Sequence, residues 1–286
     1  MEQKASGARF PLKLDADRNT QAEMMKAWSH FTKLVLVFAF AGLWGFAMAS
    51  SARAQQALDP DTQSVLAAMS NYLGGLKNFS VEYSAVDEVV TQEGQKLQFL
   101  HSGKVIVQRP NKLYAIRTGA TGSAEMFLDG KELTLYAKTA NDYLQLDATT
   151  IDTAISALHK FGFEAPGADL LAAKPLDSST ADMTSGAHVG MTFIDGAQVH
   201  QLAFRGADVD WQLWVKAGSK PLPLRYVITT KAIGGAPQYT LELRNWDVTP
   251  QIGAGQFAFT PPKGAKKLDP ASVKVDAIGD MTIKGE

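Results

Sequence analysis

The sequence predicts a mainly β, α+β fold in which a curved antiparallel sheet of about eleven strands wraps around a few helices. Apolar and polar residues alternate in short runs over most of residues 79–248, and turn residues separate the runs. This pattern is typical of an antiparallel meander. Helical spacing replaces the alternation before residue 78 and again over residues 149–173. Because such a sheet must cover its apolar face, we expect these helices to pack against it.

The first element is an apolar run over residues 34–49 (LVLVFAFAGLWGFAMA). Lys26 and Lys33 precede this run, and Ala52-Arg53-Ala54 follows it. A basic segment, an apolar segment and a small-residue cleavage site together predict a secretory signal peptide that is cleaved near Ala54. The run is shorter than the roughly 20 residues of a membrane span. The alternative is a retained single-span anchor.

The chain is therefore divided into three parts. Residues 1–54 are a cytoplasmic extension plus the signal peptide, 55–270 form one domain, and 271–286 are a C-terminal tail with weak patterning. A start at Met24 or Met25 in place of Met1 would leave a signal of ordinary length. We expect a monomeric protein in the periplasm.

A helix opens the domain. Asp59-Pro60 precede apolar residues at helical spacing, from Val65 to Leu76, and Gly74-Gly75 end the pattern. Strands follow, with Asp129-Gly130 and Asp195-Gly196 as hairpin turns and Gly103 as a bend or bulge inside a long strand. The expected strands are 79–84, 97–107, 113–118, 125–128, 131–137, 143–146, 188–194, 198–205, 210–216, 222–231, 238–248 and a short last strand over 257–260.

Two helices are expected in the middle of the chain. Residues 149–162 have Thr149 or Thr150 as N-cap, an apolar face that includes Ile155 and Leu158, and Gly162 as the stop. Residues 166–173 form a second, shorter helix candidate. We call these two segments, 149–162 and 166–173, the lid.

No arrangement of residues indicates catalysis or a cofactor. The chain has no cysteine and a formal net charge of −1, which exclude thiolate metal sites and give no basic excess for nucleic acid. Nucleophile-elbow, P-loop and dinucleotide motifs are absent from the sequence. His188 and His200 could face each other across a hairpin, either as a ligand pair or as two half-exposed strand residues. We expect no enzyme activity and no cofactor, and no metal or nucleic acid bound.

Three motifs resemble one known family. They are VQRPNKL at 107–113, DGKELTLY at 129–136 and FAFTPPKG at 257–264. The chain resembles the periplasmic lipoprotein-carrier (LolA/LolB-like) superfamily from about residue 58 to 269. Its middle, from residue 149 to 171, looks closer to a family of predicted periplasmic proteins within that superfamily. The resemblance implies a half-open antiparallel β-barrel with a helical lid, enclosing an apolar cavity that in the carriers holds acyl chains.

Arg109 matches the arginine of the carriers' Arg-Pro motif, which implies that its side chain holds the lid shut without ligand. A guanidinium has five donors in a fixed fork and can bond carbonyls at helix C-termini. The alternative is an arginine at the barrel rim whose stem covers apolar surface and whose head reaches water. The lid itself is not a close match to the carriers, so the cargo does not follow from the resemblance.

The predicted function is a periplasmic binding or carrier protein for an acyl chain, a lipoprotein or another hydrophobic ligand. The alternatives are a sensor that detects lipid and signals to a membrane partner, and a hydrolase of a lipid-like substrate. A membrane transporter or receptor is a further possible partner. Packing of a closed core is the alternative for each residue predicted to bind the ligand, because a core and a cavity have the same alternation. These residues are Val105, Val107, Arg109, Leu113, Leu133, Leu135, Phe161, Phe163, Leu170, Leu171, Leu224 and Tyr226.

Overall fold

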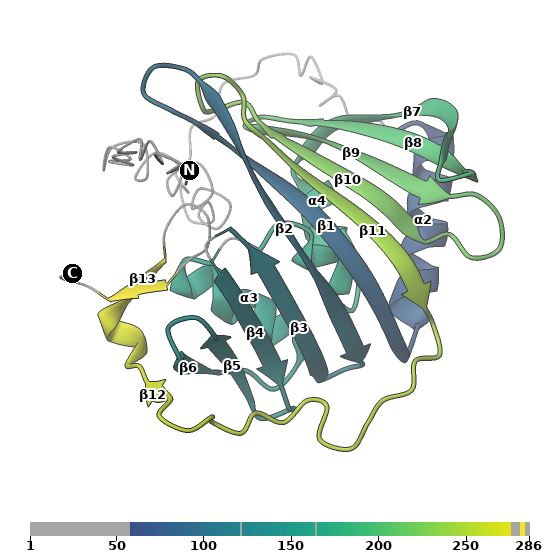
Figure 1. Cartoon of the computed structure of the whole chain (residues 1–286). Coiled ribbons are helices and arrows are strands. Elements are labelled where there is room, and N and C mark those ends of the chain that lie inside the picture. The colour runs from purple at the N-terminus through teal and green to yellow at the C-terminus, as the bar shows by residue number, and fades with distance from the viewer. Residues whose placement is uncertain (1–57, 121, 164, 276–280, 284–286) are drawn as a thin grey trace, which may run out of the picture.

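A computed structural model describes residues 58–275, except 121 and 164, and residues 281–283. The expected signal peptide and its cleavage site lie outside these residues. The fold is one open sheet of twelve strands, in the order β12-β6-β5-β4-β3-β2-β1-β11-β10-β9-β8-β7, which curls without closing (Figure 1). The strands are β1 (Asn78–Val90), β2 (Lys96–Gln108), β3 (Lys112–Gly119), β4 (Gly122–Leu128), β5 (Glu132–Ala137), β6 (Asp142–Asp147), β7 (Met183–Ile194), β8 (Ala197–Gly206), β9 (Val209–Lys216), β10 (Pro223–Thr230), β11 (Gln238–Asp247) and β12 (Lys266–Lys267).

The predicted N-terminal helix is confirmed as α2 (Pro60–Gly75). The Asp59 carboxylate caps it by accepting a hydrogen bond of 2.8 Å from the backbone N–H of Thr62, and Pro60 occupies the first turn, where no N–H partner is needed. Its buried apolar residues, Leu66, Met69 and Leu73, face the sheet. Among the described residues, no helix has the length and hydrophobicity that crossing a membrane requires.

Antiparallel pairing is confirmed for β1 to β11, as two meanders, β1 to β6 and β7 to β11, which join where β1 pairs with β11. β1 and β2 pair without a break over thirteen residues each, so Gly103 makes no bulge. A Cβ at this position would lie 1.7 Å from the carbonyl oxygen of Ile116. Tyr83, which is directly opposite, crosses this space and donates a hydrogen bond of 3.2 Å to the same oxygen. The glycine is therefore required for close approach of a neighbouring strand and ring.

The longer mid-chain helix is confirmed as α3 (Ile151–Phe161). Thr150 and Thr153 form a reciprocal capping box, and Gly162 ends the helix in the left-handed conformation. The second candidate is shorter than expected, a 3-10 helix η2 (Ala168–Leu171). A further short helix, α4 (Asp177–Ala181), follows it. These elements lie on the same side of the sheet as α2 (Figure 1).

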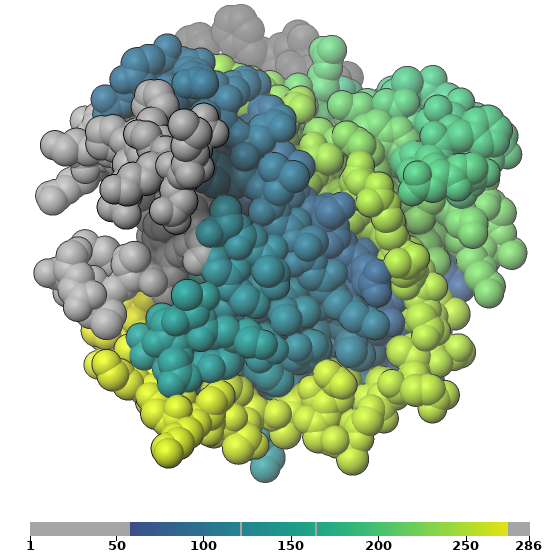
Figure 2. All heavy atoms as spheres, in the orientation of Figure 1, coloured from purple at the N-terminus to yellow at the C-terminus, as the bar shows by residue number. Residues whose placement is uncertain are grey.

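The last predicted strand, 257–260, is wrong. Phe257 ends a turn and residues 258–260 form no ladder. Phe259 instead packs on the outer face of the sheet, with ring centroids 5.0–5.4 Å from those of Phe127, Tyr136 and Tyr143. Two aromatic residues two positions apart resemble strand alternation, but here Phe259 anchors an irregular segment that Figure 2 shows along the lower rim. This segment ends in β12, which pairs with β6 in parallel.

The expected tail is partly structured. After a 3-10 helix η3 (Pro270–Ser272), β13 (Val273–Val275) pairs with β14 (Met281–Ile283) as a separate two-stranded sheet. Val273 is buried and belongs to the main hydrophobic cluster.

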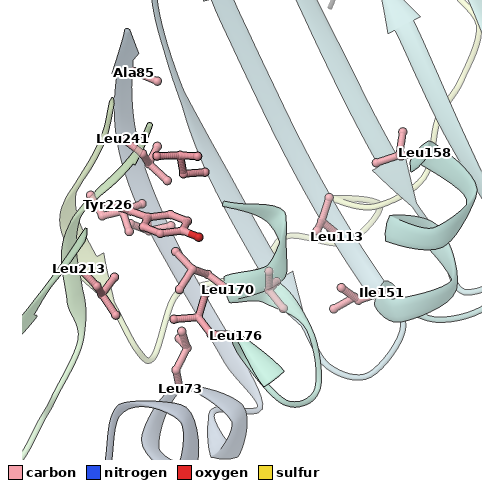
Figure 3. Packing of buried hydrophobic residues seen from close by; sticks show 14 of the residues in the cluster. Leu73, Ala85, Leu113, Ile151, Leu158, Leu170, Leu176, Leu213, Tyr226 and Leu241 are labelled. Carbon is pink, nitrogen blue, oxygen red and sulfur yellow. The ribbon is translucent and has the colours of Figure 1, made fainter. Parts of the chain in front are cut away.

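One hydrophobic cluster fills the space between the inner face of the sheet and the helices (Figure 3). α2 contributes Leu73, α3 contributes Ile151 and Leu158, and η2 contributes Leu170. Inward residues of strands from β1 to β11 complete the cluster, as period two predicts. The core is thus the layer in which the ligand site was expected.

Candidate functional site

Arg109 lies directly after the end of β2, under the lid. Its backbone N–H donates to the carbonyl oxygen of Lys77 at 2.8 Å, and its guanidinium carbon lies 5.6 Å from the centre of the Phe79 ring. Its Nη1 donates a hydrogen bond of 2.6 Å to the carbonyl oxygen of Leu171, the last residue of η2. The contact that a latch requires, from Arg109 to a helix-end carbonyl of the lid, is therefore present.

The remaining donors of Arg109 have no protein partner. Nε and Nη2 are buried and make no hydrogen bond. Burial lowers the pKa of the Arg109 guanidinium from its ordinary value, and the Asp152 carboxylate acts in the opposite direction. That carboxylate is engaged at the N-terminal turn of α3, where Oδ1 accepts the backbone N–H of Ala173 at 3.2 Å. The lid is thus connected to Arg109 through one strong bond, while the N–H groups of two guanidinium nitrogens lose their hydration.

A buried carboxyl group, Asp169, lies in the same short helix. Its Oδ2 accepts a hydrogen bond from the Ser179 hydroxyl of α4, and its Oδ1 has no partner. Burial raises the pKa of Asp169 above its ordinary value, opposed by that hydroxyl, by nearby backbone N–H groups and by His159. Burial, together with the Asp169 charge, also raises the pKa of Tyr226 well above 10. An ionised Asp169 therefore has no cation hydrogen-bonded to it.

Most residues predicted to bind the ligand lie together on the inner side, packed as core. Val107, Leu113, Leu133, Leu135, Leu170 and Tyr226 are buried. Val105, Phe161, Phe163 and Leu171 are partly buried against the same cluster. Leu224 is different, because a β-bulge between Pro223 and Arg225 interrupts the alternation of β10, and Leu224 is absent from the cluster. The role of these twelve residues in binding stays a prediction.

Two open hollows lie on the outer face of the sheet, away from these residues. One, of about 600 Å³, is lined by outward residues such as Gln98, Leu100 and Thr240. The other, of about 470 Å³, lies over β7 to β10 and includes Ala203 and Gln212. None of the twelve predicted residues lines either hollow. An apolar ligand at the inner site must therefore displace side chains that pack against one another here.

A polar group on the inner face was not predicted from the sequence. His101 Nε2 lies 3.1 Å from Asp87 Oδ2, with Tyr83 and Tyr239 beside the imidazole ring. Burial raises the pKa of Tyr83 to about 12. The signal was available, because His101 has the inward parity of Val105, and Asp87 has that of Ala85. Asp169 had no such signal, because irregular backbone surrounds it.

The histidine pair that the hairpin predicts is present. His188 Nε2 and His200 Nδ1 are 3.1 Å apart. Burial and the neighbouring His188 lower the pKa of His200. Within the described part of the chain, no group of three or more His, Cys, Asp or Glu side chains is arranged to hold a metal ion.

Comparisons with known proteins match the chain to one sequence family and to several solved structures of low sequence identity. A family model described as "Predicted periplasmic protein (DUF2092)" matches residues 62–269. No curated protein matches the chain. Among solved structures, an uncharacterised conserved protein from Thermus thermophilus is 11% identical, with 73% of this chain and 98% of that chain covered and a TM-score of 0.44.

Two further solved structures have similar values. The lipoprotein LppX of Mycobacterium tuberculosis is 14% identical, with 67% and 99% of the two chains covered and a TM-score of 0.43. A LolA superfamily protein from Nitrosomonas europaea is 12% identical, with 69% and 97% covered and a TM-score of 0.39.

Proposed function

The chain belongs to the DUF2092 family of predicted periplasmic proteins, and from that premise we propose that it binds an acyl chain or another hydrophobic ligand between the inner face of its sheet and the lid. The periplasmic location expected from the sequence agrees with this family. In the proposed mechanism the ligand replaces the lid's own apolar contacts with the sheet. The ligand would be a lipid or the acylated end of a lipoprotein.

The observation that carries the proposal is the single hydrogen bond from Arg109 to the Leu171 carbonyl oxygen. It joins the end of β2 to the lid beside an apolar cluster that includes Val107, Leu113 and Leu170. A charge-assisted bond of this kind contributes about 1.5–3 kcal/mol. Since Nε and Nη2 have no partner, opening the lid would return them to water and recover part of that energy. The closed state is therefore held, but not strongly.

The test is binding of a fluorescent fatty-acid analogue to the wild type and to Arg109→Leu. Removal of the bond lowers the cost of opening, so the apparent affinity should rise by about 10-fold and the release rate should change. Arg225→Leu is the matched control, because Arg225 lies on the outer face and pairs with Glu242 at 2.9 Å. Unchanged affinity and unchanged release rate in Arg109→Leu would reject the latch.

Native mass spectrometry of the protein purified from a periplasm tests the binding function itself. A co-purifying lipid or acylated peptide of defined mass would name the cargo. A clean protein mass, with no response to the fluorescent probe, would mean that the core stays filled by its own side chains. A stable protein partner without ligand transfer would favour the sensor alternative, and product release from an ester panel would favour a hydrolase.

A further inference from the structure

The two edge strands of the sheet differ in how far other segments cover them. β12 covers the β6 edge, with Lys266 opposite Asp142 and Lys267 opposite Tyr143. The first half of β7 is covered too, because Leu58 bridges Gly186 in parallel. Among the described residues, nothing pairs with the outer side of β7 beyond His188. An uncovered strand edge is a template for pairing with another chain.

The uncovered half of β7 is apolar. Val189, Met191 and Phe193 are 58%, 44% and 68% exposed, and they are three of the four large apolar side chains most exposed in the described structure. The stretch from 189 to 194 (VGMTFI) contains no charge and no proline. Natural edge strands usually carry charges, prolines or covering segments that prevent association. The absence of these protective features from residues 189–194 indicates that this edge associates with another chain.

In this stretch, backbone N–H and C=O groups point away from β8 at residues whose side chains are also exposed. The His188 N–H donates to the Asp59 carboxylate at 2.7 Å, so it points away from β8. A bulge between His188 and Gly190 inserts one residue and shifts the alternation. The next outward-directed N–H and C=O groups therefore belong to Met191 and Phe193, because these groups alternate along an antiparallel edge.

We infer that this edge is the interface of a homodimer, in which the β7 strands of two copies pair antiparallel about a two-fold axis at Met191. A two-fold interface must be self-complementary, and this register meets that condition. Met191 lies opposite the partner's Met191, and Val189 lies opposite the partner's Phe193. A register centred one residue later would put Val189 opposite the charged Asp195. The proposal replaces the monomer expected from the sequence, and it is independent of the ligand.

Cysteine cross-linking tests the axis directly, because the chain has no native cysteine. Residues paired by hydrogen bonds across antiparallel strands have Cα atoms about 5.5 Å apart, which is within the range of a disulfide. Met191→Cys should therefore form a disulfide-linked dimer under mild oxidation, at least about 10-fold faster than Val189→Cys, whose two copies would lie about 14 Å apart along the strands. Val189→Cys is the control, because Val189 is no less exposed than Met191.

Sedimentation equilibrium of the periplasmic protein provides the second measurement. The wild type should be a dimer that Met191→Lys converts to a monomer. Thr192→Lys is compared with it, and the thermal midpoints of the Met191→Lys and Thr192→Lys monomers should be close to each other. Equal cross-linking of Met191→Cys and Val189→Cys, or a monomeric wild type at all concentrations up to the solubility limit, would overturn the proposal. A monomer that instead pelleted with phospholipid vesicles would assign the edge to a membrane.

Discussion

Replacement of Asp169 by asparagine tests whether the lid buries an uncompensated carboxylate. The change keeps the shape of the side chain and an oxygen that can accept the Ser179 hydroxyl. Because burial raises the pKa of Asp169, the folded state holds a proton that the unfolded chain has lost. This term favours folding below the ordinary pKa of 3.8, and it is lost as the pH rises through the raised pKa of the folded state.

The expected magnitude follows from this difference in proton binding. Between the two pKa values, the free energy of unfolding of the wild type falls by about 1.4 kcal/mol per pH unit relative to Asp169→Asn. Above the folded pKa the difference becomes constant. The prediction concerns the pH dependence of this difference and not its absolute value. The amide N–H groups of the new asparagine introduce a desolvation cost of about 1–3 kcal/mol, which is independent of pH.

Urea unfolding followed by tryptophan fluorescence, at half-unit steps from pH 4.5 to 8.5, measures this slope. Asp177→Asn is the matched control, because Asp177 is exposed in the neighbouring helix α4. Parallel stability profiles for the wild type and Asp169→Asn would refute the reasoning, since they would mean that Asp169 titrates as it does in water. The pH at which the difference levels off would measure the pKa of the buried group.

Three further predictions concern other parts of the fold. Gly103→Ala should lower the free energy of unfolding, measured by urea denaturation, by about 3 kcal/mol, because its Cβ would overlap a carbonyl oxygen. Gly75→Ala is the control: no atom lies near its Cβ position, so it should raise the free energy of unfolding by up to about 1 kcal/mol. The lowered pKa of His200 beside His188 means that the wild type loses stability as the pH falls below 6.5, and His200→Gln should not show this loss; identical pH profiles would contradict it. Phe259→Ala should cost about 2 kcal/mol and lower the thermal midpoint, because three aromatic contacts are lost; an unchanged midpoint would show that the rim segment does not stabilise the sheet.

The regular part of this fold was predictable because its signals are local. Period-two alternation and the Asp-Gly turns determine the hairpins, and Thr150 and Gly162 determine the ends of α3. The prediction failed where the same local pattern has two uses. Phe257 and Phe259 alternate like a strand, but Phe259 anchors the rim segment to rings of β4, β5 and β6. The bulge that displaces Leu224 depends on pairing with β9, which no single segment encodes.

The candidate site was predictable to a similar degree. The Arg109 side chain reaches the lid as its motif implied, from a position directly after the last residue of β2, Gln108. Asp169 and the unpaired donors of Arg109 could not be predicted, since their burial depends on how η2 packs between sheet and helices. The strand residues among the twelve were named from parity, which failed for Leu224 and which does not distinguish a filled core from a cavity.

Under the proposed function, two buried polar groups of the lid region, Arg109 and Asp169, would set the cost of opening. Asp169 and Leu171 lie two residues apart in η2, so lifting this helix hydrates the Asp169 carboxyl and frees the Arg109 guanidinium in one movement. The Arg109 bond opposes opening by about 1.5–3 kcal/mol. An acyl chain that buried ten methylene groups on the sheet would gain about 8 kcal/mol, part of which replaces apolar contacts that the lid already makes. Because one apolar layer replaces another, the Arg109 bond and the hydration of Asp169 would decide the net free energy of opening. Residues that a core would be expected to exclude would therefore control whether the ligand enters.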